Sequence, residues 1–131
     1  RDLVRSRGLG DVYKRQGLEI TVKNALIGVE LSSNDQIHFI QILREALANV
    51  EKHARATKVE VCIERAPDGA CTMQVVDNGV GIPEHAEKEN HFGLSIMRER
   101  AAALGAVLSI SRRPEGGTIV FMSRPPQKSA L

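Results

Sequence analysis

Short stretches in which apolar and polar residues alternate recur along the chain and predict β-strands that bury one face. Leu18, Ile20 and Val22, for example, alternate with Glu19 and Thr21. Clusters of Pro, Gly, Asn and Asp separate these stretches, as is typical of turns. The predicted strands cover residues 18–23, 57–65, 70–77, 106–111 and 118–122.

Two other segments repeat apolar residues every three or four positions, which predicts amphipathic helices. The first covers residues 36–54 and follows Ser32-Ser33-Asn34-Asp35, whose side chains can cap its amino end. The second covers residues 93–104, and Gly105 is expected to end it. The expected buried stripes are Ile40, Leu43, Leu47, Val50 and Ala54 in the first helix, and Leu94, Met97, Ala101 and Leu104 in the second.

Strands that are apolar on one side only are typical of an antiparallel sheet with helices on one face and water on the other. The expected fold is therefore a two-layer α/β sandwich with a mixed, mostly antiparallel sheet and helices packed on one face. At 131 residues the chain is long enough for one such domain. We assign the domain to residues 17–124 and a tail to residues 125–131.

Residues 1–16 show neither helical nor strand periodicity and resemble translated sequencing adaptor, that is, a non-native leader. A linker from an upstream domain is the alternative. These residues carry a net charge of +3, which leaves about −1 for the rest of a chain whose formal net charge is +2. Because the excess of basic residues lies outside the predicted domain, we expect no nucleic-acid partner.

The expected compartment of the domain is the cytoplasm. No apolar run approaches the roughly 18 residues that span a bilayer, so we expect no membrane contact by this domain. Cys62 and Cys71 flank a turn, but alternation places Cys62 beside Glu60 and Cys71 beside Met73, on opposite faces of the predicted hairpin. We therefore expect free thiols in a reducing environment.

Glu45-x-x-x-Asn49-x-x-Lys52-His53 places four polar side chains on one stripe of the first helix, beside its apolar stripe. A magnesium ion bound mainly through phosphates needs one or two protein oxygens. The Asn49 amide is suited to that role, Glu45 can hold a metal-bound water, and Lys52 and His53 can face phosphate oxygens. The alternative is a solvated helix face.

Asp77-Asn78-Gly79-Val80-Gly81 follows the strand at 70–77. A carboxylate at this point can accept a hydrogen bond from the exocyclic amine of adenine, whereas guanine presents a carbonyl that would be repelled. Gly79 and Gly81 lack a Cβ and let the backbone approach a base closely. The alternative is an ordinary Asp-Asn-Gly turn.

Asn90-His91-Phe92-Gly93-Leu94 opens the second helix, where free N–H groups and the positive end of the helix dipole favour a phosphate. Residues 83–92 would then form a short lid over a nucleotide, hinged at Gly81 and Gly93. A capped helix start without a ligand is the alternative.

Gly116-Gly117-Thr118 leads into the last predicted strand. It can bring the threonine hydroxyl toward Asp77 and an adenine, directly or through water. The alternative is a plain hairpin turn.

In this order, the motifs resemble the ATPase domain shared by gyrase, MutL and histidine kinases, the GHKL or Bergerat fold. Glu45 and Asn49 match its asparagine box, residues 77–81 match its first glycine box, and Gly93 and residues 116–118 match the later ones. The glycine box before the second helix has a single glycine, which leaves the nucleotide contacts there less defined than in the larger relatives.

A narrower resemblance points to the nitrate/nitrite-sensor class of bacterial histidine kinases. It rests on Asn49-x-x-Lys52-His53-Ala54, on the short lid, and on His91-Phe92-Gly93-Leu94-x-x-Met97-Arg98-Glu99-Arg100. The resemblance covers residues 17 to about 124. It implies ATP and Mg²⁺ as ligands, with Glu45 and Asn49 as catalytic and metal-binding residues. The nucleotide-binding residues that it implies are Asn49, Lys52, His53, Asp77, Gly79, Gly81, Ile82, His91, Gly93, Leu94 and Thr118.

The resemblance also implies partners. In such kinases the γ-phosphate of ATP passes to a histidine on a separate dimerisation helix pair and then to an aspartate of a response regulator. No segment of this sequence resembles the helix pair, so the chain is expected to be an incomplete histidine protein kinase. The full-length protein can be anchored in the inner membrane through another segment. An anti-sigma-factor serine kinase and a non-catalytic nucleotide-sensing or protein-docking module are the alternatives.

Overall fold

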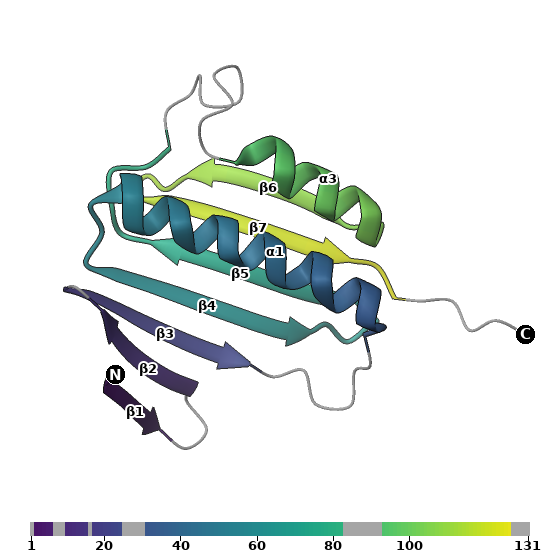
Figure 1. The fold of residues 1–131 in the computed structure, drawn as a ribbon, viewed down its shortest axis with the longest axis horizontal. Coiled ribbons are helices and arrows are strands. Elements are labelled where there is room, and N and C mark those ends of the chain that lie inside the picture. Colours follow the sequence, from purple (N-terminus) through teal and green to yellow (C-terminus); the bar gives the residue numbers. More distant parts are fainter. Residues whose placement is uncertain (1, 7–9, 16, 25–30, 83–92, 127–131) are drawn as a thin grey trace, which may run out of the picture.

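The computed structural model describes residues 2–6, 10–15, 17–24, 31–82 and 93–126. Its strands form one seven-stranded sheet, and the helices α1 and α3 both lie on the same face of that sheet (Figure 1). The predicted two-layer α/β sandwich is confirmed. The elements are β1 (Asp2–Ser6), β2 (Gly10–Arg15), β3 (Leu18–Asn24), α1 (Ser33–Asn49), the π-helix η1 (Val50–Ala54), β4 (Lys58–Arg65), β5 (Cys71–Asp77), α3 (Leu94–Leu104), β6 (Val107–Arg112) and β7 (Thr118–Arg124).

The sheet has the strand order β1-β2-β3-β4-β5-β7-β6. β3 and β4 run parallel, and each of the other neighbouring pairs is antiparallel, as predicted for a mixed, mostly antiparallel sheet. A parallel pair needs a crossover, and α1 lies within the connection from β3 to β4. β5 lies between β4 and β7 and ends at Asp77, so the predicted first glycine box begins at one end of the central strands.

The first helix begins at Ser33, three residues before the predicted start, because the Ser32 hydroxyl caps it by accepting a hydrogen bond from the N–H of Asp35 at 3.0 Å. Ser32 is one of the residues that the sequence predicts as a cap. The predicted buried stripe of this helix is wrong by one position. Phe39, Ile42 and Ala46 are buried, whereas Ile40 is 47% exposed. Leu43 and Leu47 pack against the core only in part, and Val50 is buried as predicted. The side chain of Ala54 lies outside the described part.

This offset has a physical cause. The segment from Phe39 to Leu47 is apolar over more than one helix face, so a spacing of three and four fits two neighbouring stripes equally well. The sheet then selects the stripe that contains the aromatic ring of Phe39. Packing between layers, rather than the periodicity itself, decides which stripe is buried.

The second helix agrees with the prediction more closely. Its predicted stripe of Leu94, Met97, Ala101 and Leu104 is buried. It ends at Gly105, which has the left-handed conformation (φ 68°) that glycine adopts at a helix end. Figure 1 shows α3 beside α1, over β6 and β7. The apolar sides of both helices therefore meet the same sheet face and form one core.

Cys62 and Cys71 lie on opposite sides of the sheet, as predicted. Cys71 is buried beside Met73, while Cys62 is partly exposed and its thiol lies 3.3 Å from a carboxylate oxygen of Glu60. Both cysteines are free. Burial raises the pKa of each thiol, and the hydrogen bond to Glu60 raises the pKa of Cys62 further. At neutral pH both side chains therefore remain protonated thiols.

Residues 2–6 and 10–15 form strands that their sequence pattern does not predict. β2 pairs with β3 and β1 pairs with β2, which extends the sheet beyond β3. Strand pairing uses main-chain N–H and C=O groups, so it does not require alternating side chains at an edge. Among the residues that the structure describes, no helix is long and apolar enough to cross a membrane.

Candidate functional site

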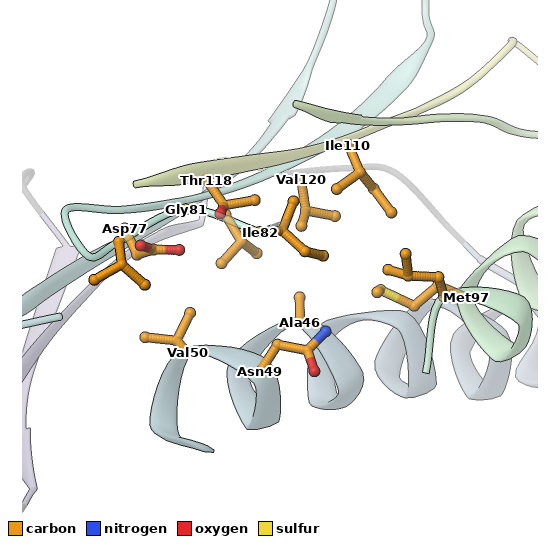
Figure 2. A pocket seen from close by; sticks show the side chains of 13 residues that line it. Ala46, Asn49, Val50, Asp77, Gly81, Ile82, Met97, Ile110, Thr118 and Val120 are labelled. Carbon is orange, nitrogen blue, oxygen red and sulfur yellow. The ribbon is translucent and has the colours of Figure 1, made fainter. Parts of the chain in front are cut away.

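A cavity of about 210 Å³ lies between α1, α3 and the sheet, at the end of β5 (Figure 2). Most of its lining is apolar, and the polar side chains that face it are Asn49, Asp77 and Thr118. The lining residues are Ala46, Asn49, Val50, Val75, Asp77, Val80, Gly81, Ile82, Leu94, Met97, Ile110, Thr118 and Val120. An apolar cavity with a few converging polar groups is the usual form of a small-molecule site.

Asp77 is the buried acidic residue of this cavity. Its side chain is at the end of β5, and the residue is 4% exposed. The N–H of Gly79 donates a hydrogen bond to its carboxylate at 2.8 Å. Burying a carboxylate is costly unless donors surround it, so a ligand that brings an N–H into the cavity would stabilise it. Thr118 is also buried and lines the same cavity.

Gly117 is packed directly against the main chain of Asp77. A Cβ at position 117 would overlap the Asp77 carbonyl, and the φ angle of 107° is one that other residues rarely adopt. The oxygen of Gly117 would in turn lie 3.2 Å from a Cβ at Gly81. The two glycine segments predicted from the sequence therefore pack against one another. This close approach brings Thr118 to the same end of the cavity as Asp77 (Figure 2).

Asn49 is the last residue of α1, and its side chain faces the cavity from the helix side (Figure 2). The helix continues as the π-helix η1 immediately after it. Single π-turns are rare and are found often at functional sites. Glu45, one turn earlier, is partly buried and does not line the cavity; a Cβ at Gly93 would overlap its carboxylate. Glu45 therefore packs against the start of α3.

The predicted stripe of four polar residues on the first helix is only partly brought together. Lys52 is exposed and lies in η1, where the wider turn changes the spacing assumed for an α-helix. His53 is also in η1, but its side chain is outside the described part. His91 and the predicted lid at 83–92 are outside it as well. The phosphate-facing roles of His53 and His91 and the lid at 83–92 therefore remain predictions from the sequence.

Residues 34–129 match the family described as histidine kinase-, DNA gyrase B-, and HSP90-like ATPase. The chain belongs to this family. The nitrate/nitrite sensor protein NarQ of Escherichia coli is 42% identical over 115 residues, which cover 88% of this chain. The histidine-protein kinase/phosphatase DegS of Brevibacillus brevis is 34% identical over 109 residues, or 83% of this chain. The predicted resemblance to nitrate/nitrite-sensor kinases is confirmed.

Solved structures agree with this assignment. The blue-light activated histidine kinase of Erythrobacter litoralis matches with a TM-score of 0.68 at 28% identity, over 81% of this chain and 35% of that one. The ATP binding domain of PrrB from Mycobacterium tuberculosis matches with a TM-score of 0.68 at 22% identity, over 87% of this chain and 84% of that one. At this identity the match supports the fold alone. This chain spans about a fifth of the length of NarQ (20%) and somewhat more of DegS (28%).

Sequence reasoning missed the role of Asn78 in this ATPase domain. Its amide oxygen accepts hydrogen bonds from the N–H groups of Thr57 (2.9 Å) and Lys58 (3.0 Å), and its amide nitrogen donates to the Thr57 hydroxyl at 3.0 Å. These bonds connect the loop after Asp77 to the segment that follows η1. An asparagine next to glycine indicates a turn, but a sequence gives no sign of a partner some twenty residues away.

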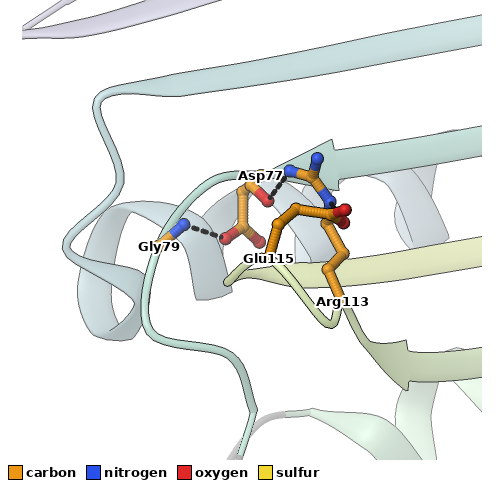
Figure 3. Close-up of polar contacts among 4 residues, drawn as sticks. All are labelled: Asp77, Gly79, Arg113 and Glu115. Atoms are coloured by element: carbon orange, nitrogen blue, oxygen red, sulfur yellow. Dashed lines mark hydrogen bonds and ion pairs between the residues drawn. The ribbon is translucent and has the colours of Figure 1, made fainter.

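Arg113 was also missed. Its Nη1 donates a hydrogen bond to the main-chain oxygen of Asp77 at 2.8 Å, and its Nε pairs with a carboxylate oxygen of Glu115 at 2.9 Å (Figure 3). An arginine in a predicted turn is usually solvated, so nothing in the local sequence singles it out. The contact exists because the turn between β6 and β7 folds against the end of β5.

Proposed function

We propose that the chain is the catalytic ATP-binding part of a two-component sensor histidine kinase. In this proposal it binds Mg²⁺-ATP and donates the γ-phosphate to a histidine on a separate dimerisation helix pair. The observation that supports it most directly is the buried Asp77 carboxylate at one end of an apolar cavity whose helix wall carries Asn49. ATP needs all three in one site: apolar walls and a hydrogen-bond acceptor for its adenine base, and an oxygen ligand for the Mg²⁺ ion on its phosphates.

The adenine would lie between the apolar walls of the cavity, formed in part by Ile82, Ile110 and Val120. Asp77 would accept a hydrogen bond from the exocyclic amine, which satisfies a carboxylate that is otherwise costly to bury. Guanine would place a carbonyl oxygen against the same carboxylate and be repelled. The Thr118 hydroxyl would contact the base directly or through water.

The phosphates would extend from the base toward α1 and the start of α3. The oxygen of the Asn49 amide suits Mg²⁺, which binds through few protein ligands when phosphates supply the others. Glu45 would hold a metal-bound water, and Lys52, His53 and His91 would face phosphate oxygens. When bound, Mg²⁺ neutralises phosphate charge, so the residues of the chain need only position the γ-phosphate for transfer.

The acceptor histidine would belong to the dimerisation helices of the full-length protein, and the phosphate would pass from there to a response regulator receiver domain. We place this domain in the cytoplasm, with an inner-membrane anchor elsewhere in the full-length protein. The high identity to NarQ over 88% of the chain favours this proposal over an anti-sigma-factor serine kinase. The buried Asp77 favours it over a protein-docking module that binds no nucleotide, because such a module has no need of a buried carboxylate in its cavity. A nucleotide-sensing module would also bind ATP, and phosphotransfer to the dimerisation helices distinguishes the two.

Calorimetric titration of the chain with ATP tests the first step of the proposal. ATP should bind in EDTA and bind more tightly when Mg²⁺ is present, whereas GTP should bind more weakly than ATP in both conditions. No heat of binding for ATP in either condition would contradict the proposal.

A further inference from the structure

We propose that Arg113 is a positioning residue for adenine recognition. Its guanidinium holds the end of β5 against the turn between β6 and β7, and so sets where the Asp77 carboxylate lies relative to Thr118. The inference rests on the proposed function, because it treats Asp77 and Thr118 as the residues that contact adenine. Arg113 itself does not line the cavity and acts through the main chain of Asp77.

The need for such a residue follows from where the strand pairing stops. The antiparallel register of β5 and β7 runs from Cys71 opposite Arg124 to Val76 opposite Ile119. The next pair in that register would be Asp77 opposite Thr118, and the ladder ends one step before it. β4 still pairs with Asp77 from the other side, through Val59. Asp77 and Thr118 are therefore not held together by the ladder that aligns the rest of their strands.

Arg113 supplies a connection at that point. Its Nη1 donates to the Asp77 carbonyl oxygen at 2.8 Å. Its own main-chain N–H donates to the oxygen of Gly117 at 2.8 Å, and its carbonyl accepts from the N–H of Gly116 at 3.1 Å. Arg113 thus closes the turn that leads into Thr118, and its side chain also donates a hydrogen bond to Asp77, the residue that Thr118 must face.

Glycine makes this connection necessary. Position 117 has no room for a side chain beside Asp77. No side chain of that residue can therefore hold the turn in place against the end of β5. The directional hydrogen bond from the Arg113 guanidinium provides that constraint instead. Figure 3 shows the guanidinium between Asp77 and Glu115.

Glu115 orients the guanidinium rather than holding the fold together. The Arg113 side chain is 24% exposed and the Glu115 side chain 64% exposed, and such an exposed ion pair contributes little to stability. The planar guanidinium can donate to Glu115 through Nε and to Asp77 through Nη1 at the same time. A lysine has a single ammonium group on a flexible stem and cannot reproduce this geometry.

The test compares Arg113→Met and Arg113→Lys with the parent chain, using dissociation constants for ATP and GTP measured by competition. Without this hydrogen bond the Asp77 carboxylate is no longer held opposite Thr118, so ATP binding should weaken by up to about tenfold, the factor that corresponds to one hydrogen bond from a charged group. GTP binding should change little, because GTP does not use the Asp77 carboxylate. The preference for ATP over GTP should therefore fall by about the same factor, and lysine should not restore it. Arg65→Met, at the far end of β4, is the matched control and should retain the parent preference.

Two outcomes would overturn the inference and leave the proposed function intact. One is an unchanged ATP preference in both Arg113 variants. The other is an equal loss of ATP and GTP affinity, which is what a purely structural defect would produce. If Arg113→Met is unfolded at the titration temperature, Glu115→Ala decides, because it removes the acceptor of Arg113 Nε. It should lower the ATP preference a few-fold without a change in thermal midpoint, and an unchanged preference would overturn the inference. If the parent itself fails to bind ATP, the proposed function fails instead.

Discussion

The main chain of Gly117 packs against the main-chain carbonyl of Asp77 so closely that a methyl group at position 117 would overlap it. This contact joins the two glycine segments of the site, which lie some forty residues apart in the sequence. It also means that the residue before Thr118 controls how near the last strand can come to the end of β5. The shape of the candidate adenine site thus depends on the absence of one side chain.

Gly117→Ala should therefore weaken ATP binding and lower the thermal midpoint. Gly105→Ala is the matched control, because position 105 also has a positive φ but a Cβ there meets nothing within 4 Å. The control should lose only the cost of a left-handed alanine, about 1–2 kcal/mol of unfolding free energy, and keep its ATP affinity. Calorimetry and thermal unfolding distinguish the two variants. Equal effects of the two substitutions on ATP affinity would contradict the steric argument.

Asp77→Ala should weaken ATP binding by about 1.5–3 kcal/mol, the range for hydrogen bonds to charged groups. The domain should remain folded by circular dichroism, because the substitution removes a buried charge rather than core packing. The preference for ATP over GTP should disappear at the same time. Unchanged ATP affinity would show that Asp77 is not in the adenine site.

Asn49→Ala should remove the part of ATP affinity that depends on Mg²⁺. Binding in EDTA should be nearly unchanged, since the apolar walls and Asp77 are intact, and this serves as the internal control. The measurement is the ratio of dissociation constants with and without Mg²⁺ for the parent and the variant. A variant that still gains as much from Mg²⁺ as the parent would exclude Asn49 as a metal ligand.

Phosphotransfer should require a second polypeptide. Incubated alone with γ-labelled ATP, the chain should bind nucleotide without acquiring acid-labile phosphohistidine. When a two-helix dimerisation segment from its full-length gene is added, that segment should become labelled, because the two reacting groups are then brought together. Asn49→Ala should abolish this labelling. Strong labelling of the chain alone on any of its four histidines would overturn the prediction.

Much of the fold can be predicted because alternation every two residues, which indicates strands, differs clearly from the spacing of three or four residues that indicates helices. Strands such as Leu18–Asn24 alternate clearly, and the stripe from Leu94 to Leu104 fits only one helix face. In the first helix, by contrast, Phe39 and Ile40 belong to two equally apolar stripes, and only the sheet distinguishes them. The strands β1 and β2 follow from main-chain pairing, which leaves no periodic signal in the sequence.

The candidate site was predicted to a similar extent. Asp77, Asn49 and Thr118 were identified from motifs, and the structure places all three around one cavity. Asn78 and Arg113 were not, because each acts through a main-chain group far away in the sequence. The change from α-helix to π-helix after Asn49 was not foreseen either, since no glycine or proline marks it. Motifs identify groups that contact a ligand, whereas the groups that align them depend on the folded chain.

The ladder between β5 and β7 ends before Asp77 and Thr118, and this has a consequence for hydrogen exchange. The hydrogen bond from Arg113 to the Asp77 carbonyl joins the turn between β6 and β7 to the end of β5, where the ladder is absent, whereas Met73 and Met122 lie within the paired and buried part of the sheet. We therefore expect amides around the Gly116–Gly117 turn to exchange through local opening, and those of Met73 and Met122 to exchange much more slowly. The sheet thus combines an end that lies beyond the β5–β7 ladder with a centre that holds its register.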